Sequence, residues 1–244
     1  MEVNEADVVS KLLTFGETVG ANELVFASDK FVGNLLRDDP FGFLLASSID
    51  RGRPAESIWQ IPAKIRGLLG HLDPCKMAKM SEDELLAVIQ QIKGKPRYPR
   101  KAARAFISAA LLVCNNYQGD TRNIWIGRKA WDTHRRLQEI KEVGPGIATM
   151  IILLLERLNE IVFDASELAF LDIKPDVHTR RVLRRLGFTH GDTDHEAIQA
   201  ARRLYPTYPG KLDAPLWEIG RKWCRPQHPK CSECVMVGLC SQEV

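Results

Sequence analysis

Apolar side chains recur along this chain at the spacing of helices rather than of strands. The ranges 41–49, 101–117 and 147–158 read as helices rich in apolar residues, and 147–158 is apolar almost throughout. A helix of that last kind is expected to be buried on most sides. Alternating strand patterns are nearly absent, and there is no internal repeat. The predicted fold class is all-α.

Polar residues mark where several of these helices begin. Asp39 stands before a proline, and Ser81 stands three residues before Glu84. An aspartate cap followed by proline predicts a helix start, and the Ser-x-x-Glu spacing predicts a capping box. A further helix is predicted over 54–65, and residues 121–133 are predicted to be irregular.

A glycine-proline-glycine sequence at 144–146 separates two predicted helices. The first is expected over 137–143 and the second from Ile147 onward. Glycine permits positive φ and close backbone approach. The second helix should therefore begin with unpaired amides near Gly146, Ile147 and Ala148, which form an anion site suited to a DNA phosphate. The alternative is a tight turn between helices with no ligand.

Four cysteines close to the C-terminus are spaced C-x6-C-x2-C-x5-C, at Cys224, Cys231, Cys234 and Cys240. Short loops make it easy to bring four thiolates around one metal centre. Zinc sites usually comprise two close cysteine pairs, whereas here there is one, so the spacing favours a [4Fe-4S] cluster over zinc. Disulfides are a weaker alternative. The remaining cysteines, Cys75 and Cys114, are expected to be plain packing residues.

The 244 residues carry a net charge of only +3, so total charge does not indicate a nucleic-acid partner. The loop 93–101, however, has five positive charges and no negative one. This loop is either solvated or in contact with phosphates. There is neither a signal-peptide pattern nor an apolar run of membrane-spanning length, which predicts a soluble intracellular protein without a membrane partner.

Three blocks together identify a family resemblance. They are LxxIxxVGPGIAT at 137–149, PDVHTxRVxxRLG at 175–187, and WxxGRxxC at 217–224, which leads into the four cysteines. In this order they resemble the helix-hairpin-helix (HhH-GPD) DNA glycosylases of the endonuclease III superfamily, iron-sulfur type. The similarity spans about residues 38–240.

The resemblance implies two helical lobes with a DNA-binding cleft, a helix-hairpin-helix at about 137–150 and a C-terminal [4Fe-4S] loop. One lobe would be a helical barrel domain over 36–160, and 1–35 plus 161–244 would form the iron-sulfur cluster domain. The implied partner is double-stranded DNA containing a damaged or mismatched base, bound by a monomer. The compartment would be the cytoplasm of a prokaryote, at the nucleoid, or the nucleus of a eukaryote.

The family's essential carboxylate corresponds to Asp176. A carboxylate stabilises the positive charge that builds on the sugar during N-glycosidic cleavage, and it can activate water. The alternative is that Asp176 only favours a helix start. His178 and Arg181 are expected to support the fold. Arg51 and Arg53 either face the space left by a flipped base or lie in a solvated loop. The residues expected to bind DNA are Gly144, Gly146, Ile147, Ala148, Arg51 and Arg53.

Bifunctional members of the family carry a nucleophilic lysine where this chain has Ala148, and the nearest lysine is Lys141. A methyl group cannot form a Schiff base, so a monofunctional glycosylase is predicted. The alternatives are a bifunctional enzyme using another amine, or a catalytically silent, structure-specific DNA-binding protein.

Residues 44–48 contain no acid, which argues against the adenine-mismatch activity of some relatives. Alkylated purines, uracil or thymine opposite guanine, and oxidised bases remain candidate lesions. Trp59, Trp125 and Trp131 belong either to a base pocket or to the core.

Overall fold

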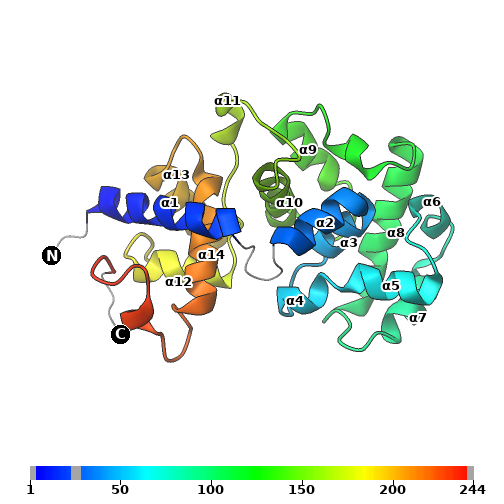
Figure 1. Ribbon diagram of the computed structural model, residues 1–244, viewed down its shortest axis with the longest axis horizontal. Coiled ribbons are helices and arrows are strands. Elements are labelled where there is room, and N and C mark those ends of the chain that lie inside the picture. Colours follow the sequence, from blue (N-terminus) through cyan, green and yellow to red (C-terminus); the bar gives the residue numbers. More distant parts are fainter. Residues whose placement is uncertain (1–3, 23–28, 241–244) are drawn as a thin grey trace. The chain divides into compact units, whose positions relative to one another are not determined.

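A computed structural model describes residues 4–22 and 29–240, and within these ranges the chain forms helices joined by turns and loops (Figure 1). No strand occurs in the described ranges, so the predicted all-α class is confirmed. None of the described helices is long and apolar enough to cross a membrane.

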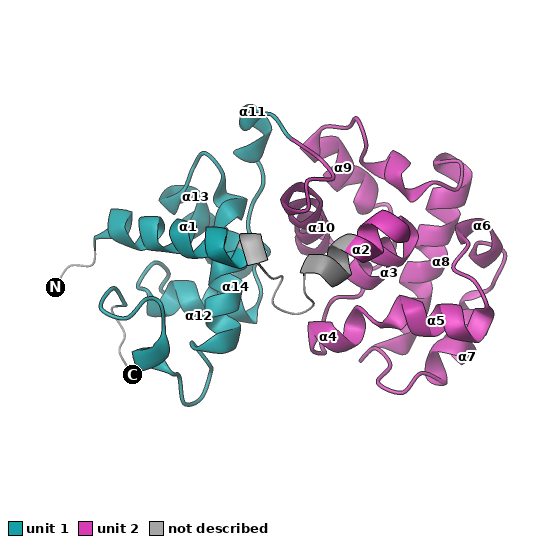
Figure 2. Cartoon of the chain, in the orientation of Figure 1, with its two compact units in different colours: residues 1–25, 163–244 teal, residues 26–162 magenta. Residues whose placement is uncertain are grey.

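The chain divides into two compact units, which Figure 2 distinguishes by colour. Unit 1 consists of residues 1–25 together with 163–244, and unit 2 is the continuous range 26–162. Unit 1 is therefore assembled from both ends of the chain.

Unit 2 is built around helix α3, which is buried along nearly its whole length. Asp39 caps α3 through the backbone N–H of Gly42, as predicted. The Phe43 ring lies 5.6 Å from that of Trp59 and 6.4 Å from that of Trp125, and α8 and α10 pack against α3. The elements of unit 2 are α2 (Asp29–Asp38), α3 (Pro40–Ser48), α4 (Ala55–Ile58), α5 (Ile61–Leu69), α6 (Pro74–Met77), α7 (Glu82–Gln90), α8 (Pro99–Asn116), η1 (Thr121–Ile124), α9 (Ala130–Leu137) and α10 (Pro145–Arg157).

Some helix boundaries in unit 2 differ from those predicted. The single helix expected over 54–65 is two helices, α4 and α5, because Pro62 has no N–H to donate to the carbonyl of Ile58. The stretch 121–133, expected to be irregular, contains η1 and the start of α9. The capping box of Ser81 and Glu84 at α7 is confirmed.

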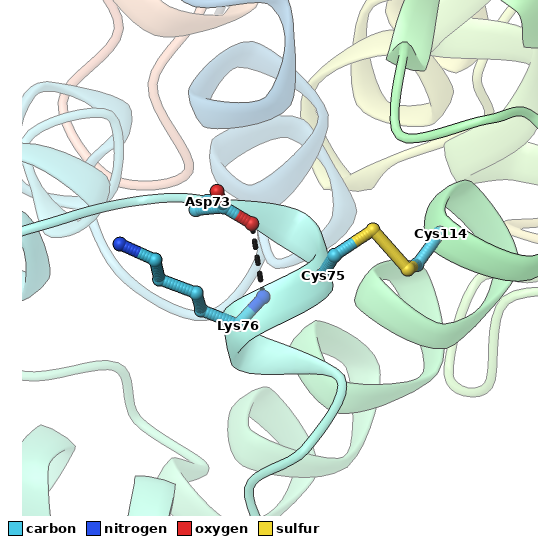
Figure 3. Close-up of a disulfide and its surroundings, with 4 residues drawn as sticks. All are labelled: Asp73, Cys75, Lys76 and Cys114. Atoms are coloured by element: carbon cyan, nitrogen blue, oxygen red, sulfur yellow. Dashed lines mark hydrogen bonds between the residues drawn. A yellow bond between two sulfur atoms is a disulfide. The ribbon is translucent and has the colours of Figure 1, made fainter.

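A disulfide joins Cys75 in α6 to Cys114 in α8 (Figure 3). The expectation that these cysteines are plain packing residues is wrong. α6 packs against α8 and brings the two Cα atoms to 5.0 Å, within the range that a disulfide spans. Asp73 caps the start of α6 by accepting a hydrogen bond from the N–H of Lys76, which lowers the pKa of Asp73.

Unit 1 packs α12 and α1 against α14. Its apolar core includes Leu12 from α1, Leu183 from α12, and Leu216 and Ile219 from α14. The elements of unit 1 are α1 (Glu5–Asn22), α11 (Ala165–Leu168), α12 (Val177–Arg185), α13 (Asp194–Leu204), η2 (Pro209–Leu212), α14 (Asp213–Lys222) and η3 (Cys231–Glu233).

Candidate functional site

Asp176 is the N-cap of α12. Its Oδ1 accepts hydrogen bonds from the backbone N–H groups of His178, at 2.7 Å, and of Thr179, at 2.9 Å. In return, the N–H of Asp176 donates to Thr179 Oγ1 at 2.8 Å, which completes a capping box. The carboxylate is thus fixed to the start of the helix at one of its two oxygens.

The second carboxylate oxygen of Asp176 remains available. All of the side-chain hydrogen bonds that Asp176 accepts from described residues involve Oδ1, and the residue is half-buried. The Oδ2 atom can therefore accept a hydrogen bond from a ligand or a water molecule without loss of the cap. The helix-start role and a chemical role for Asp176 are compatible, because each uses a different oxygen.

Arg181 joins α12 to the end of α14. Its Nε donates to the carbonyl of Cys224 at 2.7 Å, and its Nη2 donates to the carbonyl of Gly220 at 2.8 Å. Nη2 also lies 3.0 Å from His178 Nδ1. Burial lowers the pKa of Arg181, while the nearby Cys224 and Asp176 partly offset that effect. Arg181 and His178 support the fold around Asp176, as the sequence predicts.

Gly220 allows α14 to approach α12 closely. A Cβ added at Gly220 would lie 2.7 Å from His178 Cβ and 3.0 Å from His178 Cα. Any side chain at position 220 would push the first turn of α12 away. The glycine of the WxxGRxxC block therefore maintains the packing of the helix that Asp176 caps.

The four clustered cysteines line one cavity in unit 1. Apolar side chains complete its wall: Val182, Leu186, Ile219, Trp223, Met236 and Val237. Arg185 lies beside it, with Nη1 donating to Cys224 Sγ at 3.4 Å and to the carbonyl of Arg225 at 2.7 Å. The Cys240 thiol in turn donates to the carbonyl of Arg185 at 3.4 Å. Arg185 thus ties α12 to both ends of the cysteine loop.

The cysteine side chains influence one another. Burial raises the pKa of the Cys234 thiol, and Cys224, Cys240 and Cys231 raise it further, against a backbone hydrogen bond at Met236 that lowers it. Soft sulfur donors suit zinc and iron-sulfur centres. Within the described part of the chain, no group of three or more His, Cys, Asp or Glu side chains is arranged to hold a metal ion.

The hairpin of unit 2 differs in detail from its predicted form. Its first helix, α9, ends at Leu137, and 138–144 form the turn, whereas a helix was expected over 137–143. The left-handed residue of the turn is Glu142, with φ of 69°, and Gly144 has φ of −91°. The positive φ that glycine permits is therefore not used at Gly144, and the turn places it at Glu142 instead.

Helix α10 begins without a side-chain cap. Gly144 occupies the N-cap position and has no side chain, and Pro145 has no N–H. The N–H of Ala148 donates to the carbonyl of Gly144 at 3.0 Å. The prediction of a free amide at Ala148 is thus wrong, and the amides open to an anion at this helix start are those of Gly146 and Ile147.

The lysine-equivalent position of the hairpin carries no amine. Ala148 is completely buried, and its methyl group packs inside unit 2. Lys141 is exposed, with its Nζ 3.8 Å from Glu82 Oε1, and its backbone N–H donates to Ser108 Oγ.

Arg51 lies against the hairpin turn. Its Nη1 donates to the backbone carbonyl of Glu142 at 3.1 Å, and its Nη2 lies 3.4 Å from Glu142 Oε2. Arg53 is exposed and makes no hydrogen bond or ion pair with the described residues. Sequence reasoning missed Glu142, whose only local signal is an acid two positions before the first hairpin glycine.

The three tryptophans that were candidates for a base pocket differ in burial. Trp59 and Trp125 are fully buried and belong to the core of unit 2. Trp131, on α9, is 60% exposed and belongs to no core.

Comparisons with known proteins agree with this architecture. No protein-family model matches the chain. Endonuclease III of Thermotoga maritima is 25% identical over 212 residues, which cover 86% of this chain and 87% of the relative. An endonuclease III–DNA covalent intermediate, an estranged-adenine complex, superposes with a TM-score of 0.68 at 18% identity, covering 98% of this chain and 96% of the other.

A thermostable thymine-DNA glycosylase superposes with a TM-score of 0.64 at 20% identity, covering 97% of this chain and 95% of the other. These comparisons confirm the resemblance to the endonuclease III superfamily that the three sequence blocks predict. They also show that the chain has the endonuclease III fold.

Proposed function

We propose that this protein is a DNA N-glycosylase of base excision repair that hydrolyses the bond between deoxyribose and a damaged or mismatched base. The observation that carries the proposal is the carboxylate of Asp176, which is fixed by two backbone amides at Oδ1 and keeps Oδ2 available. The similarity to endonuclease III and to a thymine-DNA glycosylase supports it.

The proposed reaction begins with binding of double-stranded DNA and extrusion of the target nucleotide, because the glycosidic bond is inaccessible inside the stack. A water oxygen then bonds to the sugar C1′, and the C1′–N bond breaks with its electron pair going to the base. The water proton passes to the carboxylate of Asp176. The same carboxylate stabilises the positive charge on the sugar as the bond breaks.

Water is the proposed nucleophile because the lysine-equivalent position holds Ala148, whose buried methyl group cannot form a Schiff base. The enzyme would then be monofunctional and leave an intact abasic site. Borohydride trapping tests this point. A covalent protein–DNA adduct on lesion-containing DNA would show that another amine acts, and that the enzyme is a bifunctional glycosylase-lyase.

The amides of Gly146 and Ile147 are proposed to bind a DNA phosphate at the start of α10. This contact involves only backbone groups on both sides, so it positions DNA without reading its sequence. The proposed complex is a monomer bound to damaged duplex DNA. It would form at the nucleoid of a prokaryote or in the nucleus of a eukaryote.

We also propose that the four clustered cysteines hold a [4Fe-4S] cluster. Four thiols lining one cavity are the donor set that such a cluster takes, with one thiolate at each iron. When bound, the cluster would supply a rigid brace that fixes the cysteine loop against Arg185. Purified protein should be brown, absorb near ~400 nm and contain about four iron atoms per chain. A colourless preparation containing zinc would contradict the assignment.

The deciding experiment is a panel of duplexes, each with one alkylated, deaminated, mismatched or oxidised base. Base release is measured for the wild type and for Asp176→Asn. The proposal expects release from at least one lesion and its loss in the variant. Release from no lesion would support a structure-specific DNA-binding protein, and equal activity of the variant would remove Asp176 from the mechanism.

A further inference from the structure

Three basic side chains converge on one carboxylate in the turn of the hairpin. Glu142 Oε1 accepts a hydrogen bond from Arg104 at 3.1 Å, and Oε2 lies 3.4 Å from Arg51 and 3.5 Å from Lys101. Arg51 is 91 residues away in sequence, and Arg104 is 38 residues away. The carboxylate thus gathers cations from the loop after α3 and from the first turns of α8 onto the hairpin.

The acid lies inside this cluster and the bases lie outside it. The Glu142 side chain is 14% exposed, against 34% for Arg51, 56% for Lys101 and 42% for Arg104. Arg104 also pairs with Glu82, which pairs with Lys141. The cluster therefore contains four cations and two carboxylates, which leaves it with two excess positive charges.

The basic loop 93–101 joins the same surface. Gly52, next to Arg51, has φ of 71°, and a Cβ added there would lie 3.1 Å from Arg97 Cδ. Arg97 and Lys101 both approach the ring of Tyr98. The loop after α3, the loop before α8 and the hairpin turn are therefore contiguous, and the net positive charge of the 93–101 loop extends the surface around Glu142.

We propose that Glu142 is a positioning residue for DNA binding, which holds Arg51, Lys101 and Arg104 as a fixed set of phosphate contacts beside the amides of Gly146 and Ile147. This inference rests on the proposed function and deepens it. The hairpin would then bind a stretch of the sugar-phosphate backbone at several phosphates. Glu142 itself touches no DNA and acts through the cations that it orients.

Glu142 could affect DNA binding in two opposite ways. The direction in which affinity changes when Glu142 is replaced therefore tests the proposal. A carboxylate near DNA repels phosphates, so removal of its charge alone should strengthen binding. If Glu142 instead orients the cations, its removal should weaken binding, because phosphate contacts are lost despite the higher net charge. Each lost phosphate contact makes the negative slope of log K for DNA binding against log salt shallower by about 0.9.

The left-handed backbone at residue 142 supplies a variant that removes the side chain without straining the turn. Glycine adopts φ of 69° more readily than glutamate does, so Glu142→Gly should fold with an unchanged or higher Tm. Glu142→Gln keeps the side chain and removes only its charge. Glu139→Gln is the matched control, because Glu139 is an exposed acid of the same turn with no side-chain hydrogen bond or ion pair to the described residues.

The experiment measures Kd for a duplex carrying a stable abasic-site analogue, at salt concentrations from about 50 to 200 mM. Glu142→Gly is expected to bind the duplex about tenfold more weakly at ~0.1 M salt. The slope of its log K against log salt should be shallower than that of the wild type by about one to two. The affinity of Glu142→Gln for the duplex should also decrease, but by less than that of Glu142→Gly. Glu139→Gln should bind as tightly as wild type or slightly more tightly. In the Glu142→Gly background, Arg104→Ala should cost less than it does alone, because Arg104 contacts residue 142 through the Glu142 side chain.

The proposal is overturned if Glu142→Gln behaves as Glu139→Gln does, or if Glu142→Gly keeps or steepens the salt slope. Either result would mean that the carboxylate only neutralises charge. Base release by the wild type is measured in parallel. If the wild type binds DNA but releases no base, the proposed function fails, and the binding data still decide the role of Glu142.

Discussion

Helix α12 in unit 1 and helix α10 in unit 2 begin in opposite ways. α12 starts with Asp176, whose carboxylate accepts two amides of the first turn. α10 starts with Gly144, which offers no side-chain acceptor, and with a proline. A helix start that supplies its own anion holds a carboxylate in a fixed position, which suits the role that we propose for Asp176. A helix start without one leaves its amides for an anion from outside, such as a phosphate.

The cysteines of the two units differ in whether they bond to each other. In unit 2, Cys75 and Cys114 are joined to each other and brace α6 against α8. In unit 1, four cysteines are not joined by disulfides and surround one cavity. In unit 2 the two sulfurs are bonded to each other, whereas in unit 1 the four thiols line a cavity, where we propose that they hold a cluster.

The largest expected effect comes from the carboxylate of α12. Asp176→Asn should reduce the single-turnover rate of base release by about 10²–10⁴-fold, because the variant can neither accept a proton nor stabilise the charged sugar. Its Tm should barely change, since asparagine is as good an N-cap as aspartate. A large fall in Tm would indicate that the inactivity reflects lost structure, and would weaken the contrast between the two helix starts.

The second-largest effect is expected from the disulfide of unit 2, which should contribute to the free energy of unfolding and not to the rate of base release. The bridged residues are 39 apart in sequence, a loop for which chain entropy predicts about 4 kcal/mol. Replacing both cysteines by serine, or adding reductant, should lower the protection of α8 amides from hydrogen exchange by that amount. Protection of α12 amides serves as the control, because α12 lies in the other unit.

An aspartate placed at the start of α10 should make the two helix starts alike. Gly144 has an extended backbone, and an added Cβ would meet no atom within 4 Å, so Gly144→Asp fits without strain. The new carboxylate should cap the helix and stabilise the protein by a few tenths of a kcal/mol, because glycine is itself a tolerated N-cap residue. It should also weaken DNA affinity about 30-fold, because it occupies the amides and repels phosphate. Gly144→Ser should give a similar gain in Tm with a smaller loss of affinity.

The smallest effect separates the two roles of Asp176. Asp176→Ala should be as inactive as Asp176→Asn, and it should also lose ~1 kcal/mol of stability, because the first turn of α12 loses its acceptor. Urea denaturation of the two variants side by side measures the difference. Equal stability would mean that water satisfies the first turn of α12 as well as the carboxylate does.

Local sequence was sufficient wherever the deciding contact is local. The cap at Asp39, the capping box of Ser81 and Glu84, and the all-helical class could all be predicted, because each depends on residues within a few positions. The break between α4 and α5 was equally readable, since Pro62 removes one specific helical hydrogen bond, but the apolar pattern concealed it.

Contacts between distant residues could not be predicted in this way. Nothing near Cys75 identifies Cys114 as its partner, and nothing near Glu142 indicates a pairing with Arg51. The family resemblance supplied Asp176 as the candidate carboxylate, and the sequence offered a helix-start role as the alternative, but only the structure shows that the cap uses one oxygen and leaves the other available. Sequence patterns thus supplied the candidate groups, and packing determined how each of them is held.

The assembly of unit 1 from both chain ends has a consequence for biosynthesis. Helix α1 is synthesised about 190 residues before its packing partner α14. At a typical elongation rate, the apolar face of α1 waits roughly 10–40 s for that partner, while unit 2 can fold in the interval. Stalled nascent chains ending near residue 200 should therefore contain a protease-resistant unit 2 and a protease-sensitive α1, whose exposed apolar face would be a binding site for chaperones during synthesis.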